Sequence, residues 1–457
     1  MPAKPTLFAV ALLISTKFLV AEAPLTLQQA VEAAAKNYPS IRVSQEQINA
    51  AAAGIRLART SYLPRVDALA LVNRATRNNV FGILLPQSVI PSMSGPVLGT
   101  NNLGTAWGSA VGGLVRWEPF DFGLRQANVG VAEAVRAQSE ASLKRTQFEV
   151  TAATLDSYLT LAAAQETTKA AQAGVDRADA VVRTTHAQVN AQLRPGADSS
   201  RAEAERAAAQ TQLIQARQAV EVARAALAQF VVVDPAQIVI DAPGLLQLPP
   251  ERAPEAVDFK ANPITVEQNA TVDQARAQLR ALERSYFPKF ALEGAAYARG
   301  TGDEINGGRL GGLNGLAPNV QNYAVGFSVT FPIMDLAATR AREAAQSATV
   351  RAQTARSDLI VTELRARWNI ALAQLNGARQ VAVNTPIQVA AARTATQQAT
   401  ARYEAGLATI DQVAEAQRLL TQAEIDDALA HLSVWRALLG LATAAGDVQP
   451  FLTEASK

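Results

Sequence analysis

Few residues of this 457-residue chain have the types and spacing that chemistry at a protein site requires. The chain has no cysteine, which excludes disulfides, thiolate metal ligands, cysteine nucleophiles and a lipidated N-terminal cysteine. It has two histidines, His186 and His431, and we expect no carboxylate or second histidine beside either of them. Metal and acid–base chemistry usually needs more than this. We therefore predict that the protein is not an enzyme and has no catalytic residue, metal site or cofactor.

The acidic pair Asp411 and Glu415 has the most informative spacing. The two residues lie one helical turn apart and therefore on the same face of a helix. If several copies of that helix surrounded a narrow pore, the carboxylates would form a ring that binds cations and affects conductance. Glu203 and Glu205 hold the related place in the first half of the chain. An ordinary solvated helix face is the alternative interpretation.

The N-terminal residues 1–23 are typical of a secretory signal peptide. They combine an early lysine, an apolar run from Leu7 to Val20 and a small residue at Ala23. An uncleaved membrane anchor is the alternative. The formal net charge of the whole chain is +2, so the charge balance indicates no nucleic-acid partner.

The two halves of the chain repeat the same order of motifs. The matched pairs are Pro39 with Pro263, Ser61–Pro64 with Ser285–Pro288, Trp117–Asp121 with Phe331–Asp335, and Arg194–Gly196 with Glu404–Gly406. Such a pattern indicates internal duplication. We divide the chain into a first repeat, a proline-rich linker, a second repeat and a C-terminal tail, at residues 24–232, 233–260, 261–446 and 447–457.

Each repeat contains a long alanine-rich segment with apolar residues at helical spacing, at 124–193 and at 335–404. About 70 residues at about 1.5 Å per residue would span roughly 105 Å. A returning helix follows each segment, so each repeat should end in a helical hairpin. Helices of this length have no globular core to stabilise them and must pack as coiled coils. We expect Pro386 to kink the second long helix.

Four stretches of alternating residues predict strands. They are expected at about 63–74, 107–119, 287–299 and 321–332. In the last stretch, Tyr323, Val325 and Phe327 alternate with small or polar residues. Each stretch has about the ten-residue length of a tilted membrane-spanning strand. Alternation alone fits a soluble sandwich equally well, but the aromatic residues at the strand ends, such as Trp107 and Trp117, favour a membrane barrel.

Four strands cannot close a barrel, because small outer-membrane barrels begin at about eight strands. An open four-stranded sheet would also leave unpaired edges. Symmetric association of subunits would solve both problems. The glycine- and asparagine-rich segments 76–105 and 300–319 would then be extracellular loops at the barrel mouth.

Taken together, these motifs resemble the TolC-like outer-membrane efflux protein family, also called outer membrane factors. The motifs that support the resemblance are Leu27-x-x-Ala30-Val31, Pro39, the paired Tyr62–Pro64 and Tyr286–Pro288, Phe120–Gly123, and Arg402–Leu407. The second repeat differs at Met334–Ala337, where the family usually has a glycine after the aspartate, and Pro386 is also unusual.

The resemblance implies an α+β membrane protein with four barrel strands per subunit. A homotrimer would form a 12-stranded barrel on an α-helical coiled-coil tunnel. It would lie in the outer membrane with the tunnel in the periplasm and would export small molecules or proteins. Its partners would be outer-membrane lipid, a periplasmic adaptor protein and an inner-membrane pump of the RND, ABC or MFS type. Type I secretion uses the same architecture.

The resemblance also suggests roles for the hairpin tips, near 194–198 and 403–408. The tip residues that would meet the adaptor are Arg194, Pro195, Gly196, Arg402, Glu404, Gly406 and Leu407. Both glycines should also permit the left-handed turn at a helix end. Asp411 and Glu415 would lie at the periplasmic gate. A soluble periplasmic scaffold or adaptor is the alternative function, but an adaptor would have one hairpin and no duplicated strands.

Overall fold

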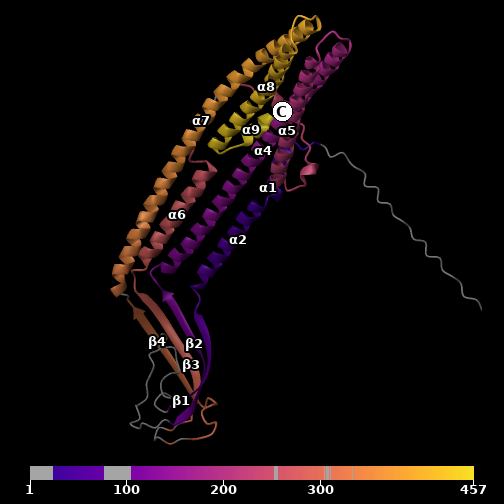
Figure 1. Cartoon of the computed structure of the whole chain (residues 1–457). Helices are drawn as coiled ribbons and strands as arrows, with labels where there is room; N and C mark the ends of the chain where they lie inside the picture. Colours follow the sequence, from indigo (N-terminus) through magenta and orange to yellow (C-terminus); the bar gives the residue numbers. More distant parts are fainter. Residues whose placement is uncertain are drawn as a thin grey trace, which may run out of the picture.

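The computed structural model describes residues 24–76, 104–251, 256–302, 304, 308, 310–331 and 333–456. The expected signal peptide, 1–23, lies outside the described residues, as do most of the first expected extracellular loop and part of the second. The molecule is long and narrow, with a β-sheet at one end and two helical hairpin tips at the other (Figure 1).

One antiparallel sheet contains four strands in the order β1-β2-β3-β4. Their bounds are Arg65–Thr76, Thr105–Phe120, Lys289–Thr301 and Val320–Thr330. The two central strands, β2 and β3, come from different halves of the chain and pair along most of their length. Within one subunit β1 and β4 each have a single neighbour, so both edges of the sheet are open to further pairing.

The two faces of the sheet differ in chemistry. On one face Tyr323, Val325 and Phe327 have exposed fractions of 85%, 78% and 64%. The other face of β4 carries alanine, glycine, serine and threonine. On this second face Arg116 of β2 forms an ion pair with Glu293 of β3 at 3.8 Å. The sheet therefore has an apolar outer face and a small, polar inner face, as a barrel wall requires.

The helices build two hairpins and a belt between them. The first repeat contains α1 (Leu27–Asn37), α2 (Pro39–Thr60), α4 (Leu124–Asn190) and α5 (Gly196–Val231). The second contains α6 (Pro263–Arg284), α7 (Leu336–Glu404) and α8 (Ile410–Ala445), and α9 (Gln449–Ala455) follows. Three short 3-10 turns, η1 (Pro235–Gln237), η2 (Pro243–Leu246) and η3 (Ile333–Asp335), complete the described elements.

The order helix, two strands and long helical hairpin occurs twice, as α2-β1-β2-α4-α5 and as α6-β3-β4-α7-α8. The expected α+β duplicated fold is confirmed, with four strands per subunit and long hairpins of 67 and 36 residues and of 69 and 36 residues. Pro386 does not end α7, which continues as a helix on both sides of it.

The largest buried core lies in the middle of the molecule. Leu155 and Tyr158 of α4 and Leu227 of α5 contribute to it. Ile238 and Leu245, from the proline-rich segment between the repeats, are buried in the same core. This segment therefore packs against the helices at their waist. The C-terminal residues do so too, because they form α9 rather than an extended tail.

The two described ends of the chain lie close together at this waist. The first helix, α1, contacts α9. Thr26, which caps α1 with its hydroxyl, lines the same 330 Å³ cavity as Ser456. Tyr158 donates a hydrogen bond to the carbonyl oxygen of Leu25 at 3.0 Å and so holds the N-terminal segment in place.

The last long helix, α8, is apolar enough over an 18-residue window to cross a membrane by length and composition alone. No such segment was expected from the sequence outside the N-terminus. However, its apolar side chains pack inside the protein, because Trp435 and Leu439 are buried in the central core and Val434 is buried against α7. We therefore attribute its hydropathy to packing between helices.

Candidate channel entrance at the hairpin tips

Both hairpins turn with the same backbone geometry. At the first tip, the amide of Leu193 donates to the carbonyl of Gln188 at 2.8 Å. At the second tip, the amide of Leu407 donates to the carbonyl of Arg402, also at 2.8 Å. This bond across five residues is the helix-ending motif in which the preceding residue adopts a left-handed conformation.

The residues in that left-handed conformation are Gln192, with φ 61°, and Gly406, with φ 78°. The expectation for Gly406 is confirmed, but the one for Gly196 is wrong. Gly196 has no positive φ and is instead the first residue of α5. The repeats therefore align with Gln192 opposite Gly406, four residues away from the match suggested by the glycines. Gln192 lacked a signal because glutamine rarely adopts this conformation.

The corrected alignment places Leu193 opposite Leu407. Both side chains are exposed, with exposed fractions of 74% and 70%. Sequence reasoning included Leu407 among the tip residues and missed Leu193, because the alignment it used was shifted. Pro195, Gly196, Arg402, Glu404 and Gly406 are exposed around these two leucines.

Arg194 points toward the other hairpin. Its Nη2 donates to the carbonyl oxygen of Tyr403 at 2.6 Å, and its guanidinium carbon lies 4.5 Å from the centre of the Tyr403 ring. The Tyr403 hydroxyl donates to Asp198 of α5 at 3.3 Å. Tyr403 is 2% exposed, and burial raises the pKa of its hydroxyl above the ordinary tyrosine value. These contacts join the two tips of one subunit.

Asp411 and Glu415 belong to a row of alternating charges between α5 and α8. Asp411 pairs with Arg201 at 3.0 Å, and Arg201 pairs with Glu205 at 3.0 Å. Glu205 then lies 3.8 Å from Arg418, which pairs with Glu415 at 2.6 Å. We call these five residues the charge row. It contains three carboxylates and two guanidinium groups, so it retains a net negative charge.

Each histidine has a carboxylate near it, which corrects the expectation from the sequence. His186 Nε2 lies 3.0 Å from Glu203, and its Nδ1 lies 3.3 Å from the Ser199 hydroxyl. His431 Nδ1 lies 4.0 Å from an oxygen of Asp427. Among the residues that the structure describes, no three histidine, cysteine or acidic side chains are grouped to hold a metal ion.

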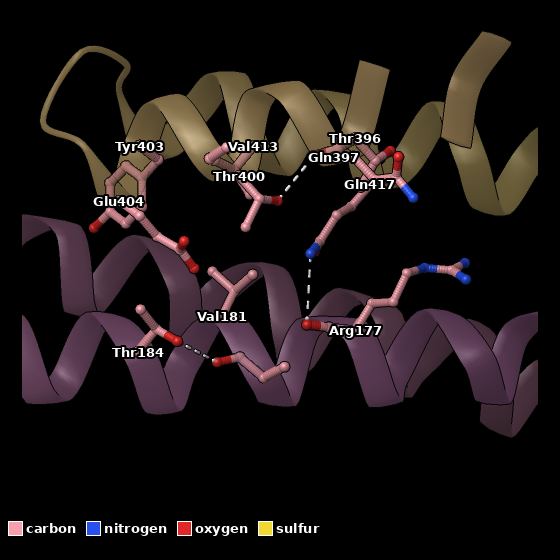
Figure 2. Close-up of a pocket in the computed structure, with 12 residues that line it drawn as sticks. Arg177, Val181, Thr184, Thr396, Gln397, Thr400, Tyr403, Glu404, Val413 and Gln417 are labelled. Atoms are coloured by element: carbon pink, nitrogen blue, oxygen red, sulfur yellow. Dashed lines mark hydrogen bonds between the residues drawn. The ribbon is translucent and has the colours of Figure 1, made fainter. Parts of the chain in front are cut away.

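A cavity of 410 Å³ separates the two hairpins just inside the tips (Figure 2). It lies between α4, which contributes Val181 and Thr184, and the end of α7 with the start of α8. On the side away from the tips, Arg177 of α4 donates to Thr421 at 2.8 Å and to Glu424 at 2.9 Å on α8. The two hairpins thus meet at the tips and at Arg177, with loosely packed space between these contacts.

A family model described as outer membrane efflux protein matches residues 30–231 and 261–447. The chain belongs to this family. The two matched segments correspond to the two repeats, and together they cover most of the chain. The resemblance inferred from the motifs is confirmed.

Relatives of known sequence and structure agree with this assignment. The cobalt-zinc-cadmium resistance protein CzcC of Cupriavidus metallidurans is 26% identical over 309 residues, which cover 66% of this chain and 69% of CzcC. The CmeC outer-membrane channel of Campylobacter jejuni has a TM-score of 0.73 at 15% identity, over 100% of this chain and 98% of CmeC. The outer-membrane protein VceC of Vibrio cholerae has a TM-score of 0.71 at 16% identity, over 92% and 96% of the two chains.

As an outer membrane efflux protein, the chain forms the exit duct of a tripartite efflux system, with its sheet in the outer membrane and its helices in the periplasm. The family and the fold are those of channels. The apolar face of the sheet is therefore the membrane-facing side. The hairpin tips lie at the far end of the molecule and form the periplasmic entrance (Figure 1).

Proposed function

We propose that three copies of this chain form a channel whose periplasmic entrance is opened through contacts of the hairpin tips with an adaptor protein. The open edges β1 and β4 support the trimer, because pairing of β4 with β1 of the next subunit would give a closed 12-stranded barrel. An inner-membrane pump would supply the transported small molecules or proteins.

The observation that carries the adaptor proposal is the matched pair of exposed tip leucines. Leu193 and Leu407 end the two hairpins in the same backbone geometry. Large apolar side chains exposed at such turns gain little within the subunit, but they can anchor a partner. Arg402 and Glu404 would add polar contacts around them, and Gly406 and Gly196 would keep the turn short. Arg194 and Pro195 would support the tip from within.

We further propose that the charge row forms the gate. Three copies would place a ring of carboxylates from Asp411 and Glu415 around the closed entrance. Arg201 and Arg418 neutralise part of this charge, so the ring would bind cations more weakly than bare carboxylates would. The same ion pairs connect the first hairpin to the second near the entrance.

The adaptor proposal is tested by changing Leu193→Glu and Leu407→Glu together in the full-length protein. Pull-down of the adaptor encoded with the channel should fall, and resistance conferred by the complete system should be lost. Trimer in the outer membrane should be unchanged, because both side chains are at the tips.

The matched control is Leu57→Glu on α2, where the leucine is 72% exposed and distant from the tips. This variant should retain adaptor binding. Undiminished adaptor capture by the double tip variant would refute the proposal, as would an equal loss in the control.

A further inference from the structure

A hollow of 460 Å³ lies on the apolar face of the sheet. Val115 and Trp117 of β2, Leu292 and Gly294 of β3, and Val325 of β4 line it, with Pro64 at one end. Glu293 also lies at the hollow, but its carboxylate pairs with Arg116, which belongs to the opposite face. The side chains that surround the hollow are therefore apolar.

The hollow exists because β3 carries no side chain at Gly294. This glycine lies directly between Val115 on β2 and Val325 on β4 in the strand register. A Cβ atom added at Gly294 would meet no atom within 4 Å, and φ at this position is not positive. Neither backbone conformation nor lack of space therefore requires glycine here.

Trp117 forms one wall, and its only polar group is already satisfied. The indole Nε1 donates to the carbonyl oxygen of Tyr62 at 3.2 Å. The rest of the ring is apolar, and 39% of the residue is exposed. The hollow consequently offers van der Waals contact and no hydrogen-bonding group from this side chain.

The hollow lies in the periplasmic half of the membrane-facing wall. Gly294 is five residues from Lys289, where β3 begins beside the helices. Five residues span about 17 Å along a strand, and a tilt of about 40° reduces this to about 13 Å of height, against an apolar band of about 25 Å. The lipid chains at this depth belong to the inner leaflet.

We propose that the hollow binds one acyl chain of a phospholipid from the inner leaflet of the outer membrane. Its continuity with the membrane-facing surface decides the occupant, because Val115 and Val325 belong to the same exposed apolar face as Phe327 and Tyr323. Lipid chains elsewhere meet a convex wall. Here a chain can contact the floor at Gly294 and walls on both sides, which adds dispersion contacts that bulk lipid lacks.

A second subunit is a poorer occupant. Further subunits would pair at the edges β1 and β4, whereas the floor of the hollow is on the central strand β3. The proposal rests on the membrane placement of the sheet and does not depend on the adaptor or gate proposals. Failure of those proposals would leave it standing.

Gly294→Leu tests the proposal, since the new side chain has room and would fill the hollow. Gly326→Leu is the matched control, because Gly326 is the neighbour of Val325 on β4, faces the opposite side and also has no atom within 4 Å of an added Cβ. The full-length channel would be purified from outer membranes in mild detergent, and phospholipid retained per subunit would be counted by native mass spectrometry.

We expect the wild type and Gly326→Leu to retain similar amounts of phospholipid. Gly294→Leu should retain at least about tenfold less, which corresponds to about 1.4 kcal/mol of binding free energy. Equal retention in Gly294→Leu and the wild type would overturn the proposal, as would an equal loss in both variants.

A second measurement needs no change at the glycine. Phospholipid with brominated acyl chains, which quench nearby tryptophan, would be added to the wild type and to Trp117→Phe. The difference between the two proteins reports the Trp117 signal. Quenching that saturates at a small mole fraction of brominated lipid is expected for a bound chain. Quenching that rises in proportion to the mole fraction throughout would indicate bulk lipid only and refute the proposal.

Discussion

At the scale of single residues, Arg125 joins three parts of the subunit below the barrel. Its Nε donates to Asp121 at 2.8 Å, and its Nη1 donates to the carbonyl oxygen of Ser61 at 3.3 Å. Its guanidinium also lies 4.8 Å from the centre of the Tyr62 ring. Asp121 accepts bonds from the amides of Gly123 and Arg125 as well, so it caps the start of α4.

Arg125→Ala should therefore destabilise the channel by about 3–5 kcal/mol, because it leaves the carboxylate of a buried ion pair without its partner. Both side chains of the pair are only 10% exposed. Thermal or denaturant unfolding of the purified channel measures the effect. Arg136→Ala, which breaks a half-exposed pair with Glu140 on the same helix, should cost at most about 1 kcal/mol. A similar loss in both variants would contradict this explanation.

The gate proposal also makes a prediction at this scale. Asp411→Ala combined with Glu415→Ala removes the two most exposed carboxylates of the charge row, whose side chains are 69% and 73% exposed. Block of the channel by multivalent cations in planar bilayers should weaken. The matched control, Asp273→Ala with Glu221→Ala, removes two exposed acids far from the entrance and should leave block unchanged. Unaltered block in the gate variant would remove the basis for a carboxylate ring.

The sequence indicated the residues with local signals and missed those whose role depends on distant partners. Asp121 and Gly406 were recognisable because capping and left-handed turns depend on neighbouring residues. Arg201 and Arg418 were not, because their pairing requires the relative positions of α5 and α8, which are far apart in the chain. The contact of Arg194 with Tyr403 was missed for the same reason.

At the scale of elements, α7 contains an interior proline that it tolerates. Pro386 has no amide hydrogen to donate to the carbonyl of Ala382, and its ring crowds the preceding turn. The neighbouring Thr385 is buried and donates from its hydroxyl to Asp427 of α8 at 2.6 Å. Packing against α8 therefore holds α7 in place where its own hydrogen bonding is weakest.

Pro386→Ala should restore the missing bond and stabilise the subunit by up to about 3 kcal/mol. The midpoint of thermal unfolding should rise. Thr385→Val should lower it, because the Asp427 carboxylate loses a donor. A midpoint unchanged by Pro386→Ala would show that α7 has already adjusted its backbone to the proline at no cost.

Long elements were easier to predict than short ones. The strands and long helices repeat their pattern over many residues, and their periodicity was visible in the sequence. The seven-residue α9 was expected to be part of a tail, because two turns carry too little periodicity to recognise. The proline-rich segment between the repeats shows the same limit, since Ile238 and Leu245 enter the core without regular spacing.

At the scale of the whole molecule, the two faces of the sheet make opposite demands. Val325→Arg places a charge on the membrane-facing side and should cost about 2–4 kcal/mol near the bilayer midplane. Ser328→Arg places the same charge on the inner face of the same strand, where water is available. Heat-resistant trimer recovered from outer membranes should fall for Val325→Arg and persist for Ser328→Arg. The reverse order would mean that the faces have been assigned wrongly.

Duplication was the main whole-molecule feature that the sequence revealed, because matched motifs recur in the same order. The differences between the repeats needed the structure. Asp121 caps α4 beside a left-handed turn at Phe122 and Gly123, whereas Asp335 makes no such bond and ends the 3-10 turn η3. Where the second repeat lacks the glycine, Tyr286 donates to Glu343 at 2.6 Å and connects α6 to α7 instead.

The closeness of the chain ends at the waist has a consequence for how the gene could be arranged. Because α1 and α9 touch, a short linker could join them with little entropic cost, and the chain could be opened between the repeats. A circularly permuted gene, with the secretion signal moved in front of the second repeat, would then encode the same subunit. Such a permutant should insert and export, since the order in which the repeats are synthesised affects none of the contacts between them.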